Sequence, residues 1–332
     1  MNSSRKAGNE GFGDRNAGPG FWDIIRWLRN RQPGPWREWI PGAYGPKPPK
    51  RVGDGQVRVT FVGHSTVLVQ FDRRNILTDP IWSERASPVS WAGPRRHRLP
   101  GLRLEDLPPI DAILVSHDHY DHLDAPTLRR LARDHGPEIF CPLGVAKLLR
   151  TLGFPQPHER DWWGTADWSP GMRLHCLPAR HFSGRSLFDR NRTLWCSWLV
   201  ESASGNVYFG ADTGFGSHFR EIGRRFPPPR LALLPIGAFR PEWLMHPVHM
   251  SPDEAFEAHK LLGAETSVAI HHGTFRLADD GETEAVGRLR SLAAADPASA
   301  PFLALEEGAG YEIPSLVQMA KRPARCGSPV RN

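Results

Sequence analysis

Cysteine is scarce in this chain of 332 residues, and long apolar runs are missing. The four cysteines show no close-paired spacing, so we expect reduced thiols in a reducing compartment. No apolar run approaches the roughly 20 residues that cross a bilayer. The first twenty residues are polar and glycine-rich and lack the apolar core of a secretory signal. These absences argue against a disulfide scaffold or a membrane-spanning protein and predict a cytoplasmic protein with a large core.

Positive charge is concentrated at the two ends of the chain. The net charge is +6, of which residues 1–50 carry +5 and residues 320–332 carry +4, leaving −3 for the body. A nucleic-acid-binding domain would instead spread basic residues over a folded face. The distribution therefore predicts no nucleic-acid partner, and it is typical either of solvated tails or of contact with a lipid surface.

The segment FWDIIRWLRN at 21–30 has the pattern of an amphipathic helix. Two tryptophans flank an apolar stripe with i, i+3, i+4, i+7 spacing, made of Phe21, Ile24, Ile25 and Leu28. Such a helix could make a peripheral contact with a membrane. It could equally pack its apolar face on the folded domain, which is the commoner arrangement.

Strand patterns begin after an irregular basic arm, rich in proline and glycine, that we assign to residues 1–56. Apolar runs bounded by turn residues predict strands at 57–62, 66–71, 75–80, 112–116, 172–179, 193–202, 206–212, 231–237 and 267–273. Helices are predicted at 125–136, 143–152, 252–262 and 282–294. The clustering favours an α/β fold of two mixed sheets packed face to face with helices outside. We place this domain at 57–318 and a basic tail at 319–332.

Within the run AILVSHDHYDHLD at 112–124, the six residues HDHYDH contain three histidines and two aspartates, and they come just after four apolar residues in a row and one serine. Given this composition, His-x-His-x-Asp-His would arise by chance about twice in a thousand such chains. His117 and His119 stand two residues apart in extended chain and point to one side. Asp121 and His122 follow where the chain turns toward a helix. Imidazole and carboxylate groups in this pattern indicate a metal site.

Three later positions repeat the arrangement of a strand end followed by a ligand-type residue. They are His181 in LPARHFSG, Asp212 in FGADTGF and His271 in AIHHGTF. Each stands beside glycine or other small residues, which lets the backbone crowd around an ion. Together with HDHYDH they supply the seven ligands, one of them a bridging carboxylate, that two ions would need.

These motifs resemble those of the metallo-β-lactamase-fold hydrolases, and within them the N-acylphosphatidylethanolamine-hydrolysing phospholipase D group. The resemblance runs from about residue 57 to about residue 280. HDHYDH is shared across the superfamily, whereas TDPIWSERASP at 78–88 together with AIHHGTF at 269–275 is more specific to the group. The resemblance implies the αββα sandwich of that fold and, without direct support from the sequence, a homodimer.

The resemblance also implies a role for individual residues. One zinc would be held by His117, His119 and His181, a second by Asp121, His122 and His271, with Asp212 bridging both. Asp79 would orient a ligand histidine, and Tyr120 and His249 would contact the phospholipid head. His64 is either another orienting group or a structural turn histidine. His272 stands where the family has tryptophan, which leaves two adjacent histidines for one ligand position; we favour His271.

The implied reaction is cleavage of a phosphodiester by a metal-bound hydroxide, with two zinc ions per chain. The group's substrate would be N-acylphosphatidylethanolamine, giving N-acylethanolamine and phosphatidic acid. His249 is one candidate for the acid that protonates the leaving group. Manganese or iron suits the same ligands. The alternatives are hydrolysis of lactones or of other phosphodiesters, nucleic acid included, because the fold does not choose the substrate. A non-catalytic membrane adaptor is a further, weaker alternative, since the ligand set is nearly complete.

Overall fold

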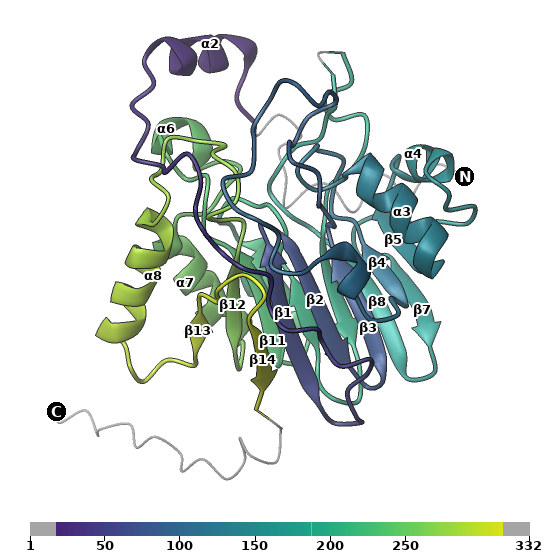
Figure 1. Ribbon diagram of the computed structural model, residues 1–332. Helices are drawn as coiled ribbons and strands as arrows, with labels where there is room; N and C mark the ends of the chain where they lie inside the picture. Colours follow the sequence, from purple (N-terminus) through teal and green to yellow (C-terminus); the bar gives the residue numbers. More distant parts are fainter. Residues whose placement is uncertain (1–17, 187, 315–332) are drawn as a thin grey trace, which may run out of the picture.

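Two seven-stranded sheets lie face to face in the computed structural model, which describes residues 18–186 and 188–314 (Figure 1). The first sheet has the order β14 (Gly310–Ile313), β1 (Val57–Gly63), β2 (Thr66–Phe71), β3 (Arg74–Thr78), β4 (Ala112–Leu114), β5 (Glu138–Pro142) and β6 (His158–Arg160). The second has the order β13 (Phe302–Leu303), β12 (Ser267–Ile270), β11 (Leu231–Pro235), β10 (Val207–Phe209), β9 (Ser197–Glu201), β8 (Met172–Leu177) and β7 (Thr165–Ser169).

Most strands are buried on both faces, which explains why they read as nearly continuous apolar runs. In β2, Val67 and Val69 point into the core between the sheets, while Leu68 points to the outer face. In β11, Leu233 enters the same central core and Leu234 the opposite layer. The period of two in a strand therefore divides each run between two hydrophobic layers.

Helices close the outer layer on each side. The first sheet is covered by α3 (Ala125–His135) and α4 (Ala146–Thr151), and the 3-10 helix η1 (Leu104–Asp106) contributes to the same apolar cluster. The second sheet is covered by α5 (His218–Arg225), α7 (Pro252–Leu262) and α8 (Glu284–Ala295). This helix–sheet–sheet–helix order confirms the predicted fold class.

The long predicted strands and the four predicted helices are present with shifted ends. Strands β5, β6, β7, β13 and β14 and helices α5 and α6 (Glu242–Met245) were not predicted. Of these, β6 and β13 have only two or three residues and carry no readable period. The predicted end of the domain at 318 and the basic tail at 319–332 lie outside the described residues. No helix in the described part of the chain has the length and apolar character needed to cross a bilayer.

The amino-terminal arm is tied to the domain at several points; Arg37, for example, pairs with Glu282, and the N–H of Gly45 donates to the carbonyl of Gly101. Helix α2 (Phe21–Arg29) lies near α6 (Glu242–Met245) at one end of the molecule (Figure 1). Trp27 packs beside the apolar cluster that includes Leu244, and its indole donates a hydrogen bond of 2.9 Å to Asp279. Trp27, which lies beside the predicted apolar stripe and is not part of it, therefore helps to anchor the helix on the domain.

Parallel strands bring the predicted ligands to one edge. In the first sheet β3, β4 and β5 run parallel. In the second sheet β10, β11 and β12 run parallel, and β8 shares their direction because it is separated from β10 by one antiparallel strand. The carboxyl ends of these strands therefore face the same way, and the loops that follow them can meet.

Candidate metal centre

Strained backbone marks the strand ends where the predicted ligands meet. Four non-glycine residues beside or within the ligand set have left-handed backbone: His64 (φ 56°), Asp79 (φ 29°), Ala211 (φ 53°) and His271 (φ 57°). Such a conformation costs an L-residue on the order of 1 kcal/mol. Strain of this kind concentrates at functional sites, where the surrounding structure holds it in place.

One group of three ring nitrogens converges from two segments. His117 Nε2 lies 2.8 Å from His119 Nδ1, and His181 Nε2 lies 3.2 Å from the same nitrogen. All three side chains offer an atom within 4.8 Å of the others. His117 and His119 follow β4, whereas His181 follows β8 in the opposite sheet, so the group spans the two sheets.

A second group gathers around Asp121. His122 Nε2 lies 3.3 Å and His271 Nε2 3.6 Å from Asp121 Oδ2. His64 joins them, with Nε2 at 2.9 Å from the same oxygen. Asp121 is a carboxylate, so we assign the proton in this contact to His64, which donates. The contact supports the view that His64 orients a ligand rather than merely filling a turn.

Asp212 lies between the two groups. Its Oδ2 is 3.1 Å from His122 Nε2, 3.0 Å from His271 Nε2 and 3.7 Å from His181 Nε2. His249 approaches from another side, with Nδ1 at 4.0 Å. The structure therefore brings all seven predicted ligands into one cluster and puts the carboxylate that was predicted to bridge in the central position.

The electrostatics of this cluster favour a cation. Burial lowers the pKa of His117 and of His181 well below the ordinary value, so both rings are neutral. Burial also disfavours charge on His122, but the carboxylates of Asp212 and Asp121 outweigh it and raise the pKa well above the ordinary value. The pKa of Asp212 is well below its usual range despite burial, because His122 and His271 stabilise its charge.

The donor set fits divalent metal ions. His122 Nε2, His271 Nε2 and Asp212 Oδ1 are buried and lack a hydrogen-bond partner within the described residues. Buried polar atoms are normally satisfied, so these atoms point to a ligand. Zinc and related ions bind unprotonated imidazole nitrogens and ionised carboxylates, so an ion bound here would replace the protons that the neighbouring carboxylates favour on His122 and His271, whose pKa values are raised. The fit supports a divalent ion and leaves its identity to experiment.

Hydrogen bonds behind the cluster fix several ring orientations. Asp79 accepts from His122 Nδ1 at 2.7 Å and from the backbone N–H of Ser116 at 2.8 Å. The hydroxyl of Ser116 also contacts His117 Nδ1 at 2.8 Å, and His181 Nδ1 lies 3.0 Å from the carbonyl of Val248. Metal-bound imidazoles usually have such a partner on the second nitrogen. The sequence reasoning missed Ser116, although its place directly before His117 at a strand end was a usable signal.

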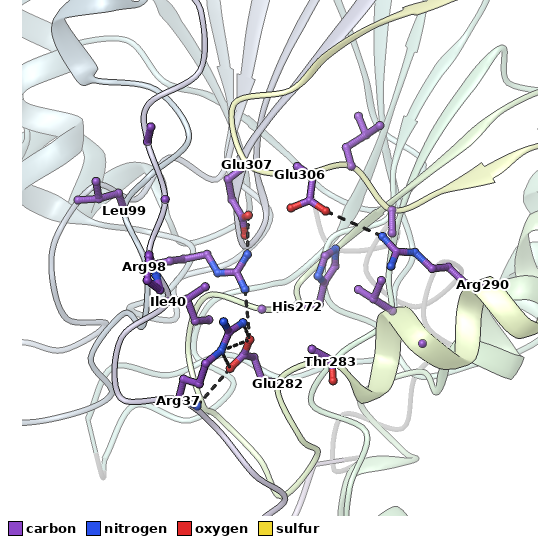
Figure 2. Close-up of a pocket in the computed structure, with 18 residues that line it drawn as sticks. Arg37, Ile40, Arg98, Leu99, His272, Glu282, Thr283, Arg290, Glu306 and Glu307 are labelled. Atoms are coloured by element: carbon purple, nitrogen blue, oxygen red, sulfur yellow. Dashed lines mark hydrogen bonds and ion pairs between the residues drawn. The ribbon is translucent and has the colours of Figure 1, made fainter.

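The adjacent histidines at 271 and 272 face different surroundings. His271 belongs to the cluster, whereas His272 stacks on Phe61 with ring centroids 5.3 Å apart. Figure 2 shows His272 among Arg98, Glu307 and Arg290, in a cavity of about 530 Å³ that none of the seven predicted ligands lines. This geometry supports the choice of His271 as the ligand.

Tyr120, predicted to contact substrate, is held beside the cluster. Its hydroxyl donates to the carbonyl of Arg185 at 3.1 Å, and the Arg185 guanidinium lies 3.8 Å from the ring centroid. Arg185 in turn donates to the carbonyls of Asp118 and Leu123. Tyr120 is thus a fixed part of the wall next to the ligands.

Comparison with known proteins places the chain in a family. A family model described as "Beta-lactamase superfamily domain" matches residues 74–272. The chain belongs to this superfamily. Igni18, a metallo hydrolase from the archaeon Ignicoccus hospitalis, superposes with a TM-score of 0.58 at 25% identity, covering 77% of this chain and 98% of that one. The predicted superfamily is confirmed.

Two curated relatives within the superfamily are more similar in sequence. The chain is 44% identical over 247 residues to an uncharacterized protein of Mycobacterium tuberculosis, covering 73% of this chain and 65% of the relative. It is 42% identical over 236 residues to N-acyl-phosphatidylethanolamine-hydrolyzing phospholipase D 1 of Caenorhabditis elegans, covering 68% and 65%. The chain thus spans slightly less than two thirds of the length of both relatives.

Proposed function

We propose that this protein is a di-zinc phosphodiesterase that hydrolyses N-acylphosphatidylethanolamine to N-acylethanolamine and phosphatidic acid. The observation that carries the proposal is the central Asp212 carboxylate, which lies within 3.1 Å of a histidine from each sheet, His122 and His271. The similarity to the phospholipase D of Caenorhabditis elegans supports the choice of substrate.

Two zinc ions at this site would supply positive charge for a phosphodiester anion and acidity for a water molecule. The chain's own groups prepare the site for that chemistry. Asp79 accepts a hydrogen bond from the Nδ1–H of His122, so the other nitrogen of that ring points into the cluster. His64 does the same for one oxygen of Asp121. These contacts hold the ligands in position before substrate binds.

Room for the substrate lies beside His249. A cavity of about 450 Å³ is lined by His249 together with Gln32, Arg240, Ser251 and other residues from α6, the start of α7 and the arm. His249 therefore stands between the metal cluster and a pocket of the size used by small ligands. We assign it the role of contacting the phosphodiester head as it approaches Asp212.

Product analysis by mass spectrometry tests the proposal. Zinc-loaded protein would be incubated with N-acylphosphatidylethanolamine in mixed micelles, beside a His117→Ala variant shown to be folded. We expect release of N-acylethanolamine and phosphatidic acid, with the release lost in the variant. Protein that binds two metals but releases neither product would refute the substrate, and lactones and other phosphodiesters would then be tested.

A further inference from the structure

Another cavity, of about 490 Å³, is formed by the amino-terminal arm, the chain between Trp82 and Glu105, and helix α3. We refer to it as the arm cavity. Three aromatic residues, four arginines and two glutamates line it, together with a few apolar residues. None of the seven predicted metal ligands lines it, so it is separate from the metal centre. Its volume falls in the range that sites for small molecules usually have.

Two aromatic side chains of the arm cavity are free to stack on a ligand. Trp39 and Tyr44 are 42% and 38% exposed, and neither side chain makes a hydrogen bond within residues 18–186 and 188–314. The backbone beside them is anchored, because the N–H groups of Ile40 and Gly45 donate to carbonyls of the domain at 2.6 and 2.7 Å. The third ring, that of Trp82, is held by its indole N–H, which donates to a backbone carbonyl at 2.8 Å. The aromatic wall is therefore in place before a ligand binds.

Acidic side chains do not balance the arginines of the arm cavity. Glu84 pairs with Arg95, and Glu105 pairs with Arg130 at an N···O distance of 3.5 Å. Each glutamate therefore neutralises one arginine, and no other carboxylate among the described residues lines the cavity. Four arginines and two glutamates leave the wall with a net charge of +2.

The two remaining arginines have no carboxylate partner in the part of the chain that the structure describes. Arg103 is exposed, and its guanidinium lies 4.9 Å from the ring centroid of Tyr44. Arg96 is only 5% exposed, and its guanidinium donates to backbone carbonyls, among them that of Ile81 at 3.1 Å. Burial lowers the pKa of Arg96 to about 10, so the group stays charged at neutral pH. A buried charge without a counterion is costly, which favours an anion in the cavity.

We propose that the arm cavity binds a small aromatic anion, which is a flat ring that carries a phosphate or carboxylate group. The ring stacks on Trp39 and Tyr44, and the anionic group binds the guanidinium of Arg103, beside the charge of Arg96. Guanidinium groups bind phosphate and carboxylate through paired hydrogen bonds, and they also stack on aromatic faces. A ring without charge would leave the arginines unbalanced, and an anion without a ring would leave the aromatic wall exposed to water. This site goes beyond the proposed function.

Isothermal titration calorimetry of the full-length, zinc-loaded protein tests the site with four probes. Adenosine 5′-monophosphate and 2-naphthoate each combine a ring with an anion, whereas adenosine has only the ring and ribose 5-phosphate only the anion. We expect one or both of the combined probes to bind at least about tenfold more tightly than the other two. Preference for the nucleotide would identify a phosphate ester as the ligand, and preference for naphthoate a carboxylate. Equal binding of all four probes, or binding of none, would overturn the proposal.

Matched variants locate the bound probe. We expect Arg103→Gln and Trp39→Leu each to weaken binding of the tighter probe by about tenfold, because each removes one of the two contacts. Both side chains are exposed, so the fold should persist. The controls are Arg29→Gln and Trp243→Leu, which change exposed residues outside the cavity and should bind as wild type. Wild-type binding by both cavity variants would show that the probe binds elsewhere, and the proposal would be wrong.

A metal-site variant separates the arm cavity from the metal centre. We expect folded His117→Ala protein to bind the tighter probe as wild type, since His117 does not line the cavity. If probe binding disappears together with the zinc, the anion binds the metal centre and the proposal is wrong. The cavity variants should keep two metals, as measured by mass spectrometry. None of these readouts depends on turnover, so failure of the phospholipase proposal would leave the test of the cavity intact.

Discussion

Asp212→Asn is the sharpest test of the metal centre, because it removes one charge and almost no volume. The carboxylate lies 3.0 Å from His271 Nε2 and 3.1 Å from His122 Nε2, and the side chain is nearly inaccessible to solvent. Unit charges about 3 Å apart interact by about 5 kcal/mol at an effective dielectric of about 20. Because an ion also loses hydration on binding, we count half of that energy, which corresponds to about a hundredfold in affinity.

We therefore expect Asp212→Asn to bind fewer than two metal ions, with affinity at least about a hundredfold lower and turnover reduced by about a thousandfold. Metal content by mass spectrometry and titration with zinc would be measured on protein shown to be folded by circular dichroism. The asparagine side chain still fills the position, so the core should remain intact.

Asp118→Asn is the matched control. Asp118 lies within the same HDHYDH run, but its carboxylate accepts from the N–H of Gly184 at 2.8 Å and from the hydroxyl of Thr193 at 2.9 Å. We expect this variant to keep two metals, with a loss of stability of about 1 kcal/mol from the weakened hydrogen bonds. An Asp212→Asn protein that keeps both metals and wild-type turnover would refute the central role of this carboxylate.

Three further predictions concern the support of the site and of the fold. Asp79→Asn, which weakens the 2.7 Å contact to His122, should lower metal affinity by about tenfold to a hundredfold in a zinc titration. Chelation should lower the melting temperature, and added zinc should restore it, because an ion that binds only the folded chain stabilises it; an unchanged melting temperature would argue against a metal in the fold. Burial lowers the pKa of His259 to about 4, so the unfolded chain takes up a proton below pH 6.5 that the native state does not. Urea unfolding should therefore show a loss of up to about 3 kcal/mol from this group as the pH falls from 6.5 to 4, and His259→Gln should reduce that slope.

Part of the metal centre could be predicted from the sequence because four of its ligands lie close together in the chain. His117, His119, Asp121 and His122 lie within six positions after an apolar run, and strand geometry alone puts the first two on one side. The later ligands were selected because each follows a strand end. The resemblance to a known family then assigned them to particular ions, which spacing could not do.

The fold class was readable for a similar reason. Strands such as β2 and β11 are covered on both faces, so they appear as apolar runs bounded by turn residues. The order of strands within each sheet was not readable, because a strand's pattern shows that it is buried but not which neighbour it pairs with. Strands β6 and β13 were missed because they are two or three residues long, whereas β5, β7 and β14 were missed although each has four or five residues.

The sequence by itself therefore determined which residue types end the buried strands, because apolar periodicity and ligand chemistry are properties of short segments. Tertiary structure decided which atoms face one another. His271 and His272 are neighbours with the same side chain, so the sequence could not decide which of them joins the cluster. Their different positions follow from the left-handed backbone at His271, with φ 57°, and from the packing of His272 on Phe61. In the same way, His64 reaches Asp121 only because two loops far apart in the chain meet at one edge of the paired sheets.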